Sequence, residues 1–87
     1  MTNKVKVHLP ITLGQFLKVA GLVGTGGEAK YVIAEGMVKV NNETDTRRGR
    51  KLLDGDIVSL EKTALGNKTS AIAMVVVEGV VAQDNNT

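Results

Sequence analysis

The sequence contains no cysteine, one histidine and only two aromatic residues, Phe16 and Tyr31, in a chain of 87 residues. Without cysteine the chain can form no disulfide bond and offers no thiolate to a metal or a substrate. A single histidine, His8, leaves no second imidazole for a metal site, and no Ser–His–Asp set can be identified. We therefore expect a protein without catalytic residues, metal, cofactor or small-molecule substrate.

Long hydrophobic runs are also absent. No stretch approaches the roughly 20 apolar residues that a membrane-spanning helix requires, and no apolar secretory segment follows the first residues. The length allows one domain. We expect this domain to occupy residues 1–82 and the polar residues 83–87 to form a disordered tail. These features predict a cytoplasmic protein with no membrane partner.

Two short helices are predicted in the first half of the chain, at residues 12–20 and 25–36. Apolar residues recur there at the spacing of one helix face, and Gly21 and Gly36 stand where helices commonly end. Each helix begins with a threonine placed three residues before a glutamine or a glutamate, the spacing of a capping box. These pairs are Thr12 with Gln15 and Thr25 with Glu28.

Strands are predicted on both sides of the helices. Alternating or β-branched residues indicate strands at residues 4–9, 38–40, 43–46, 57–60 and 72–77, with a loop at residues 62–70. In the first strand, Val5, Val7 and Leu9 share the face expected to be buried. The order of these elements predicts an α+β fold, in which a helix–turn–helix-like pair packs on a small, mostly antiparallel sheet.

The net charge is only +2, but positive residues are concentrated in one short segment. Four basic residues surround Gly49, and the nearest acidic residues lie outside the run. They are Arg47, Arg48, Arg50 and Lys51. Because arginine can bind phosphate oxygens with two parallel hydrogen bonds, this cluster favours a polyanion as partner. A solvated charged loop is the alternative interpretation. Lys18 and Lys30, on the two helices, could extend the same surface or simply face solvent.

The start of the second predicted helix offers a further candidate site. Residues 24–29 match the G-x-G-x-x-A pattern of dinucleotide-binding folds, but no strand precedes them and the chain is too short for that fold. Thr25, Gly26 and Gly27 could still present bare backbone N–H groups to an anion. Alternatively, the two glycines only accommodate a tight corner between helices. Since so few aromatics are present to stack on bases, we expect recognition of structured RNA through phosphates and shape.

Several segments together resemble the RNA-binding domain named after ribosomal protein S-four, which carries the alpha-L motif. The resemblance covers about residues 11–60 and rests on segments 12–18, 24–30, 33–36, 38–42 and 55–58. It implies a protein in which two helices and an adjoining β loop hold RNA, and the lack of catalytic groups makes a non-enzymatic function the expected one. The chain is most similar to short stand-alone bacterial members, which implies ribosomal RNA, or the ribosome, as partner and a role in ribosome assembly.

The sequence departs from that family at two positions, because many members carry arginine where Thr12 and Gly26 stand. We therefore expect the arginines of residues 47–51 to be the main phosphate contacts, with Thr25–Gly27 and Lys30 secondary. A protein–protein adaptor is the alternative function. It would use the basic segment against an acidic partner, or an exposed strand for β-augmentation. The valines of such a strand are Val75, Val76, Val77, Val80 and Val81.

Overall fold

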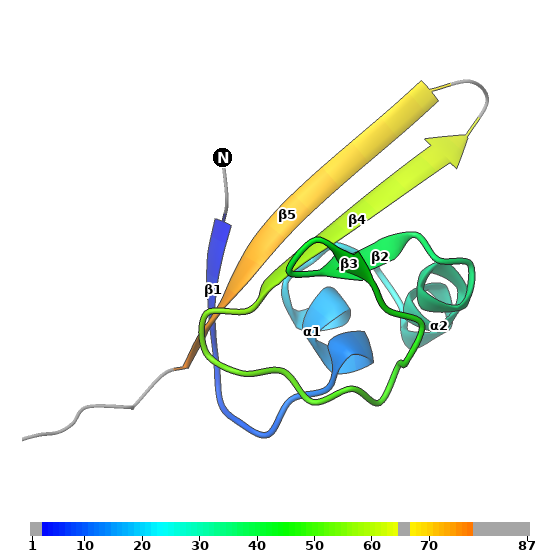
Figure 1. The fold of residues 1–87 in the computed structure, drawn as a ribbon. Helices are drawn as coiled ribbons and strands as arrows, with labels where there is room; N and C mark the ends of the chain where they lie inside the picture. The colour runs from blue at the N-terminus through cyan, green and yellow to red at the C-terminus, as the bar shows by residue number, and fades with distance from the viewer. Residues whose placement is uncertain (1–2, 65–66, 78–87) are drawn as a thin grey trace, which may run out of the picture.

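A computed structural model of the chain describes residues 3–64 and 67–77. Two helices pack against one face of a five-stranded sheet (Figure 1), which confirms the predicted α+β fold. The helices are α1 (Leu13–Val19) and α2 (Gly26–Ala34). The strands are β1 (Asn3–Val7), β2 (Val38–Val40), β3 (Glu43–Thr44), β4 (Ile57–Ala64) and β5 (Asn67–Val77).

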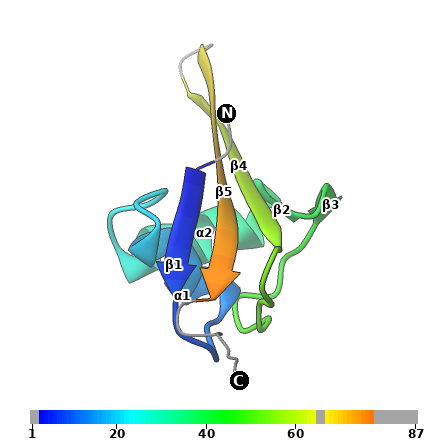
Figure 2. The ribbon, with the colours of Figure 1, turned by 90° about the vertical axis from the view of Figure 1, so that its left-hand side faces the viewer.

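The sheet has the strand order β1-β5-β4-β2-β3, and its neighbours are antiparallel except for one pair. The exception is β1 with β5, which run side by side in the same direction (Figure 2). The predicted mostly antiparallel sheet is therefore confirmed. Val75–Val77 pair with β1 on one side, and on the other side the N–H groups of Val75 and Val77 donate to Asp56 and Asp54, so these residues offer no free edge. The exposed-strand form of the adaptor is wrong for these residues, while Val80 and Val81 lie outside the described residues.

The hydrophobic core lies between the inner face of the sheet and the two helices. Phe16 and Leu17 from α1 meet Val32 and Ile33 from α2, and all four side chains are fully buried. The remaining core residues are Val7, Ile11, Leu13, Val23, Ala29, Val38, Val40, Leu52, Val58, Leu60, Ala73 and Val75. The aromatic ring of Phe16 is thereby committed to packing.

The first strand is shorter than its alternating pattern indicates. Pairing with β5 ends at Val7, so Leu9 does not join the buried face and is 40% exposed. The expectation for Leu9 is wrong because the chain bends between the end of β1 and α1. Within residues 3–64 and 67–77, no helix has the length and apolar character needed to cross a membrane.

One of the two predicted capping boxes is complete. At α1, the Thr12 hydroxyl accepts from the Gln15 N–H at 3.2 Å, and the Gln15 Oε1 accepts from the Thr12 N–H at 3.0 Å. At α2, Thr25 accepts from the Glu28 N–H, but the Glu28 carboxylate accepts from the Gly24 N–H instead of from Thr25. The prediction of a second capping box is therefore right for the bond to the Thr25 hydroxyl and wrong for the bond to the Glu28 carboxylate. The other Glu28 oxygen bonds Lys62 of β4 at 2.6 Å.

The predicted loop at residues 62–70 is mostly strand. β4 continues to Ala64 and β5 begins at Asn67, so the two strands form a long hairpin that extends beyond the helices (Figure 1). The expectation failed because a projecting hairpin needs no apolar face and is held by its backbone hydrogen bonds. Gly66, one basis of that expectation, lies outside the described residues, as does the expected tail at residues 83–87.

Candidate nucleic-acid interface

The segment of residues 47–51, called the basic loop below, crosses the beginning of α1. The Leu13 N–H donates to the Arg50 carbonyl at 2.8 Å, and the Gly14 N–H donates to the Arg48 carbonyl at 3.1 Å. A bridge between Thr12 and Lys51 continues this pairing. The loop carbonyls thus satisfy N–H groups that a helix leaves free at its start. As a consequence, the backbone of the basic loop is fixed to α1.

Gly14 allows this close approach. A Cβ atom at Gly14 would lie 2.7 Å from Cγ of Arg48 and 3.4 Å from its Cδ, so the Arg48 stem occupies the space that any larger residue needs. Sequence reasoning did not single out Gly14. Its position inside a helix could have indicated a role, because glycine lowers the stability of a helix by roughly 1 kcal/mol relative to alanine. A glycine inside a helix is therefore often explained by close packing against it.

Asp45 joins two of the predicted site residues. Its carboxylate accepts from Nε and Nη2 of Arg47 at 3.0 and 2.8 Å, and from Nη1 of Arg50 at 2.7 Å. The Arg47 backbone N–H donates to the same carboxylate at 2.9 Å. The side chain of Asp45 is only 5% exposed. These hydrogen bonds, that of the Arg47 side chain foremost, hold the pKa of Asp45 well below its usual range.

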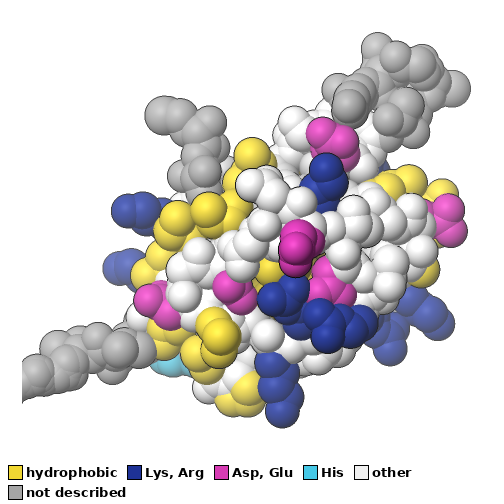
Figure 3. Space-filling model, in the orientation of Figure 1, with side chains coloured by type: hydrophobic (Ala, Val, Ile, Leu, Met, Phe, Trp, Pro, Cys, Tyr) yellow, Lys and Arg dark blue, Asp and Glu magenta, His cyan; other side chains and the backbone are white. Residues whose placement is uncertain are grey.

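The cluster therefore carries less free charge than its sequence indicates. Asp45 lies outside the basic run along the chain but inside it in space, where it partly neutralises Arg47 and Arg50. Arg47 stays 70% exposed on its solvent side, whereas Arg50 is 28% exposed. In the part of the chain that the structure describes, no ion pair engages Arg48 or Lys51. Figure 3 shows Lys and Arg side chains beside acidic ones on this face.

The basic loop, α1 and the start of α2 enclose a hollow of about 470 Å³, called the basic hollow below. It brings together Lys18, Gly26 and Arg48, which sequence reasoning took from three separate segments. Its lining residues are Thr12, Gly14, Gln15, Lys18, Gly26, Ala29, Arg48 and Gly49. Lys18 of α1 and Arg48 of the basic loop thus line the same hollow as Gly26, the first residue of α2.

The other predicted site residues lie outside this lining. Thr25 uses its hydroxyl to cap α2, accepting from the Glu28 N–H at 3.0 Å, so its first role is structural. Gly27 and Lys30 are exposed on α2, and Lys51 is exposed on the basic loop. These residues lie close along the chain to residues that line the hollow.

The sequence matches the S4 domain over residues 5–66, which is most of the chain. The chain belongs to the S4 domain family. A relative from Bacillus subtilis, named as a ribosome maturation protein, RlbA, is 50% identical over 62 residues, covering 70% of this chain and 87% of the relative. A relative from Escherichia coli, named as an RNA-binding protein, YbcJ, is 40% identical over 52 residues, covering 60% of this chain and 74% of the relative. The resemblance drawn from the sequence is confirmed.

In this S4 domain, Thr12 and Gly26, the two positions at which the sequence departs from the arginine of many family members, both line the basic hollow. Thr12 is committed to the capping box of α1, and Gly26 is the first residue of α2. Neither supplies a charge, but Arg48 lines the same hollow from the basic loop. The positively charged residues that line the basic hollow are therefore Arg48 and Lys18.

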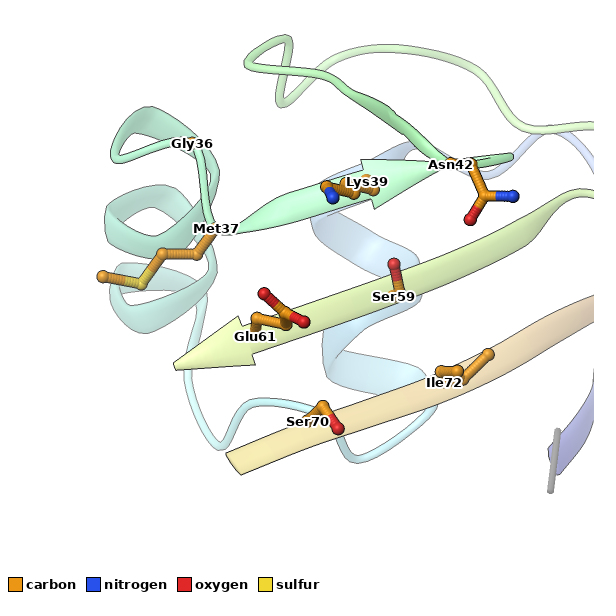
Figure 4. A pocket seen from close by; sticks show the side chains of 8 residues that line it. All are labelled: Gly36, Met37, Lys39, Asn42, Ser59, Glu61, Ser70 and Ile72. Atoms are coloured by element: carbon orange, nitrogen blue, oxygen red, sulfur yellow. The ribbon is translucent and has the colours of Figure 1, made fainter. Parts of the chain in front are cut away.

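A second hollow lies on the open face of the sheet, next to the end of α2 (Figure 4). Lys39, Ser59 and Ser70 project into it from β2, β4 and β5, and Glu61 lies beside them. With one positive and one negative side chain it offers little net charge to a polyanion. Its lining residues are Gly36, Met37, Lys39, Asn42, Ser59, Glu61, Ser70 and Ile72. The basic hollow is the better candidate for nucleic acid.

Proposed function

We propose that this S4 domain is a non-enzymatic RNA-binding protein that holds structured RNA by its phosphates at the basic hollow and the basic loop. The observation that carries the proposal is the meeting of Lys18, Gly26 and Arg48 in one hollow. Membership of the S4 domain family supports it. So does the relative named as an RNA-binding protein.

The geometry suits phosphate contacts that are organised before RNA arrives. Hydrogen bonds to Leu13 and Gly14 fix the loop backbone, and Asp45 fixes the heads of Arg47 and Arg50. Binding then orders fewer groups, which lowers its entropic cost. Arg48 keeps a guanidinium available for two parallel hydrogen bonds to a phosphate. Recognition by phosphates and shape favours folded RNA over a single strand.

The expected partner is ribosomal RNA or an assembling ribosome. The Bacillus subtilis relative is named as a ribosome maturation protein and aligns over 87% of its own length, which supports this partner and a role in ribosome assembly. Such a partner would place the protein in the cytoplasm.

The test compares two single substitutions with a matched control. Arg48→Ala and Lys18→Ala should each weaken binding of a ribosomal RNA hairpin roughly tenfold, the equivalent of about 1.4 kcal/mol, because each removes one phosphate partner. Lys39→Ala removes an equal charge from the open face of the sheet and should leave affinity unchanged. Fluorescence anisotropy of a labelled hairpin measures all three.

An affinity loss in Lys39→Ala equal to that in Arg48→Ala would show a diffuse charge effect and refute the site. Circular dichroism of each variant verifies that the fold is retained. Charge reversal at Arg47 and Arg50 is a poorer test, because it would set new carboxylates against Asp45.

A further inference from the structure

A third hollow, called the side hollow below, adjoins the basic hollow on α1. It has a volume of about 500 Å³, within the range of small-ligand sites. Gln15 and Lys18 line both hollows, so the two meet along one side of the helix. The lining residues of the side hollow are His8, Pro10, Ile11, Gln15, Lys18 and Val19. A ligand held in one hollow can therefore extend into the other.

The walls of the side hollow differ in character from those of the basic hollow. Pro10 and Val19 are exposed apolar residues, with Val19 60% exposed, and Ile11 is buried beneath them. His8 adds a flat ring that is accessible to solvent. Apolar walls and an imidazole ring suit the face of a nucleobase, and histidine is among the side chains on which unstacked bases lie.

Gln15 supplies an oriented polar group at the border of the two hollows. Its Oε1 accepts from the Thr12 N–H at 3.0 Å as part of the capping box. That bond fixes which end of the side-chain amide is engaged and leaves the NH₂ group to donate. A donor held in this way can bond an acceptor on a base edge or on a ribose.

We propose that the side hollow receives a nucleobase of the RNA, next to a phosphate that Lys18 and Arg48 hold in the basic hollow. The inference rests on the proposed function and adds a base contact to a mode of binding otherwise made of phosphate contacts. Lys18 stands at the junction, where a ribose joins the phosphate to its base. His8 would stack on the base, and Gln15 would donate to its edge.

The test compares adenosine 5′-monophosphate with ribose 5-phosphate, which has the same sugar and phosphate but no base. Nuclear magnetic resonance titration of the whole chain should show the nucleotide binding about five- to tenfold more tightly, the lower end of what base stacking contributes. The nucleotide alone should shift the signals of His8 and Val19. Both ligands should shift that of Lys18.

His8→Ala should remove most of the preference for the nucleotide while leaving the affinity for ribose 5-phosphate unchanged. Tyr31→Ala, which removes an exposed aromatic ring from α2, is the matched control and should keep the preference. Val19→Ser is a second variant that should reduce the preference without touching His8.

Equal affinities for the two ligands, no signal shifts at His8 and Val19, or an undiminished preference in His8→Ala would each overturn the subsite. Hairpin binding separates this failure from failure of the proposed function. If the subsite is wrong but the function holds, the unaltered protein still binds the hairpin and Arg48→Ala still weakens it. If the hairpin itself does not bind, the proposed function fails.

Discussion

At the scale of single residues, Asp45 decides how the basic loop is built. Its buried carboxylate takes hydrogen bonds from two arginines and from one backbone N–H. Removing one partner of a buried ionic group leaves the others unsatisfied, which costs more than an exposed ion pair contributes. Asp45 is therefore a positioning residue for Arg47 and Arg50.

Asp45→Asn should lower the free energy of unfolding by about 2 kcal/mol, because the neutral amide replaces a carboxylate that accepts charged hydrogen bonds. Urea denaturation measures the change. Glu43→Gln, at an exposed neighbouring site, is the control and should stay within about 0.5 kcal/mol of the parent. A variant at Asp45 as stable as the control would show that the buried carboxylate contributes nothing to the fold.

The same carboxylate makes stability depend on pH. Its pKa in the folded protein lies below its value in the unfolded chain, about 3.9. Its contribution is then complete above the unfolded value and is lost as the pH falls below about 4 toward the folded value. Acid titration of unfolding free energy should show a steeper decline for the parent than for Asp45→Asn. Parallel curves would contradict this assignment.

At the scale of elements, α1 and the basic loop form one unit. The loop caps the helix through its carbonyls, and the helix admits the Arg48 stem because residue 14 has no side chain. The position of the Arg48 guanidinium therefore depends on Gly14, which offers no side chain to the RNA.

Gly14→Ala should weaken hairpin binding about three- to tenfold, because the new Cβ would lie 2.7 Å from Cγ of Arg48 and displace that side chain. Stability should change little, since alanine favours the helix by up to about 1 kcal/mol and offsets the crowding. Anisotropy and thermal unfolding measure the two effects. Gly24→Ala, where a Cβ meets only Oε1 of Glu28 at 3.9 Å, is the control. Unchanged hairpin affinity in Gly14→Ala would show that Gly14 does not position Arg48 for RNA binding.

Local patterns predicted most of these elements, because caps and apolar spacing act within a few residues. Both helices are capped by the predicted threonines, Thr12 and Thr25. The long hairpin was missed because its outer pairing needs no apolar alternation. The bond from Glu28 to Lys62 was missed because it spans 34 positions along the chain.

The candidate site was predictable in composition but not in geometry. A run of basic residues indicates a polyanion, yet it does not show that Asp45 engages Arg47 and Arg50 while Arg48 lines the hollow. Those facts depend on how the loop lies across α1. The close contact of Gly14 with Arg48 depends on the same placement and has no signature in residue spacing beyond a glycine inside a helix.

At the scale of the whole molecule, a net charge of +2 hides an uneven distribution. The helical side carries the basic hollow and the basic loop, whereas the hollow on the open face of the sheet is lined by one lysine and one glutamate. Long-range attraction to RNA should therefore be strongest on the side of the basic loop, which orients the approach as well as accelerating it.

Salt titration tests this distribution. If about three phosphates are neutralised, the logarithm of hairpin affinity should fall against the logarithm of salt concentration with a slope of roughly −2 to −3. Arg48→Ala should make the slope shallower by about 1, whereas Lys39→Ala should not change it. Anisotropy between about 50 and 200 mM salt covers the useful range. A slope near zero for the parent would mean that phosphate contacts do not drive binding.

The parallel pairing of β1 with β5 bears on the order in which the chain can fold as it is made. Among the described elements β1 is synthesised first, but its strand partner β5 is the last strand described. Both helices and β2, β3 and β4 therefore emerge before β1 can close the sheet. The helices and the basic loop can assemble while β1 still lacks its strand partner. The proposed RNA site thus belongs to segments that precede β5 along the chain and are complete before β1 can pair.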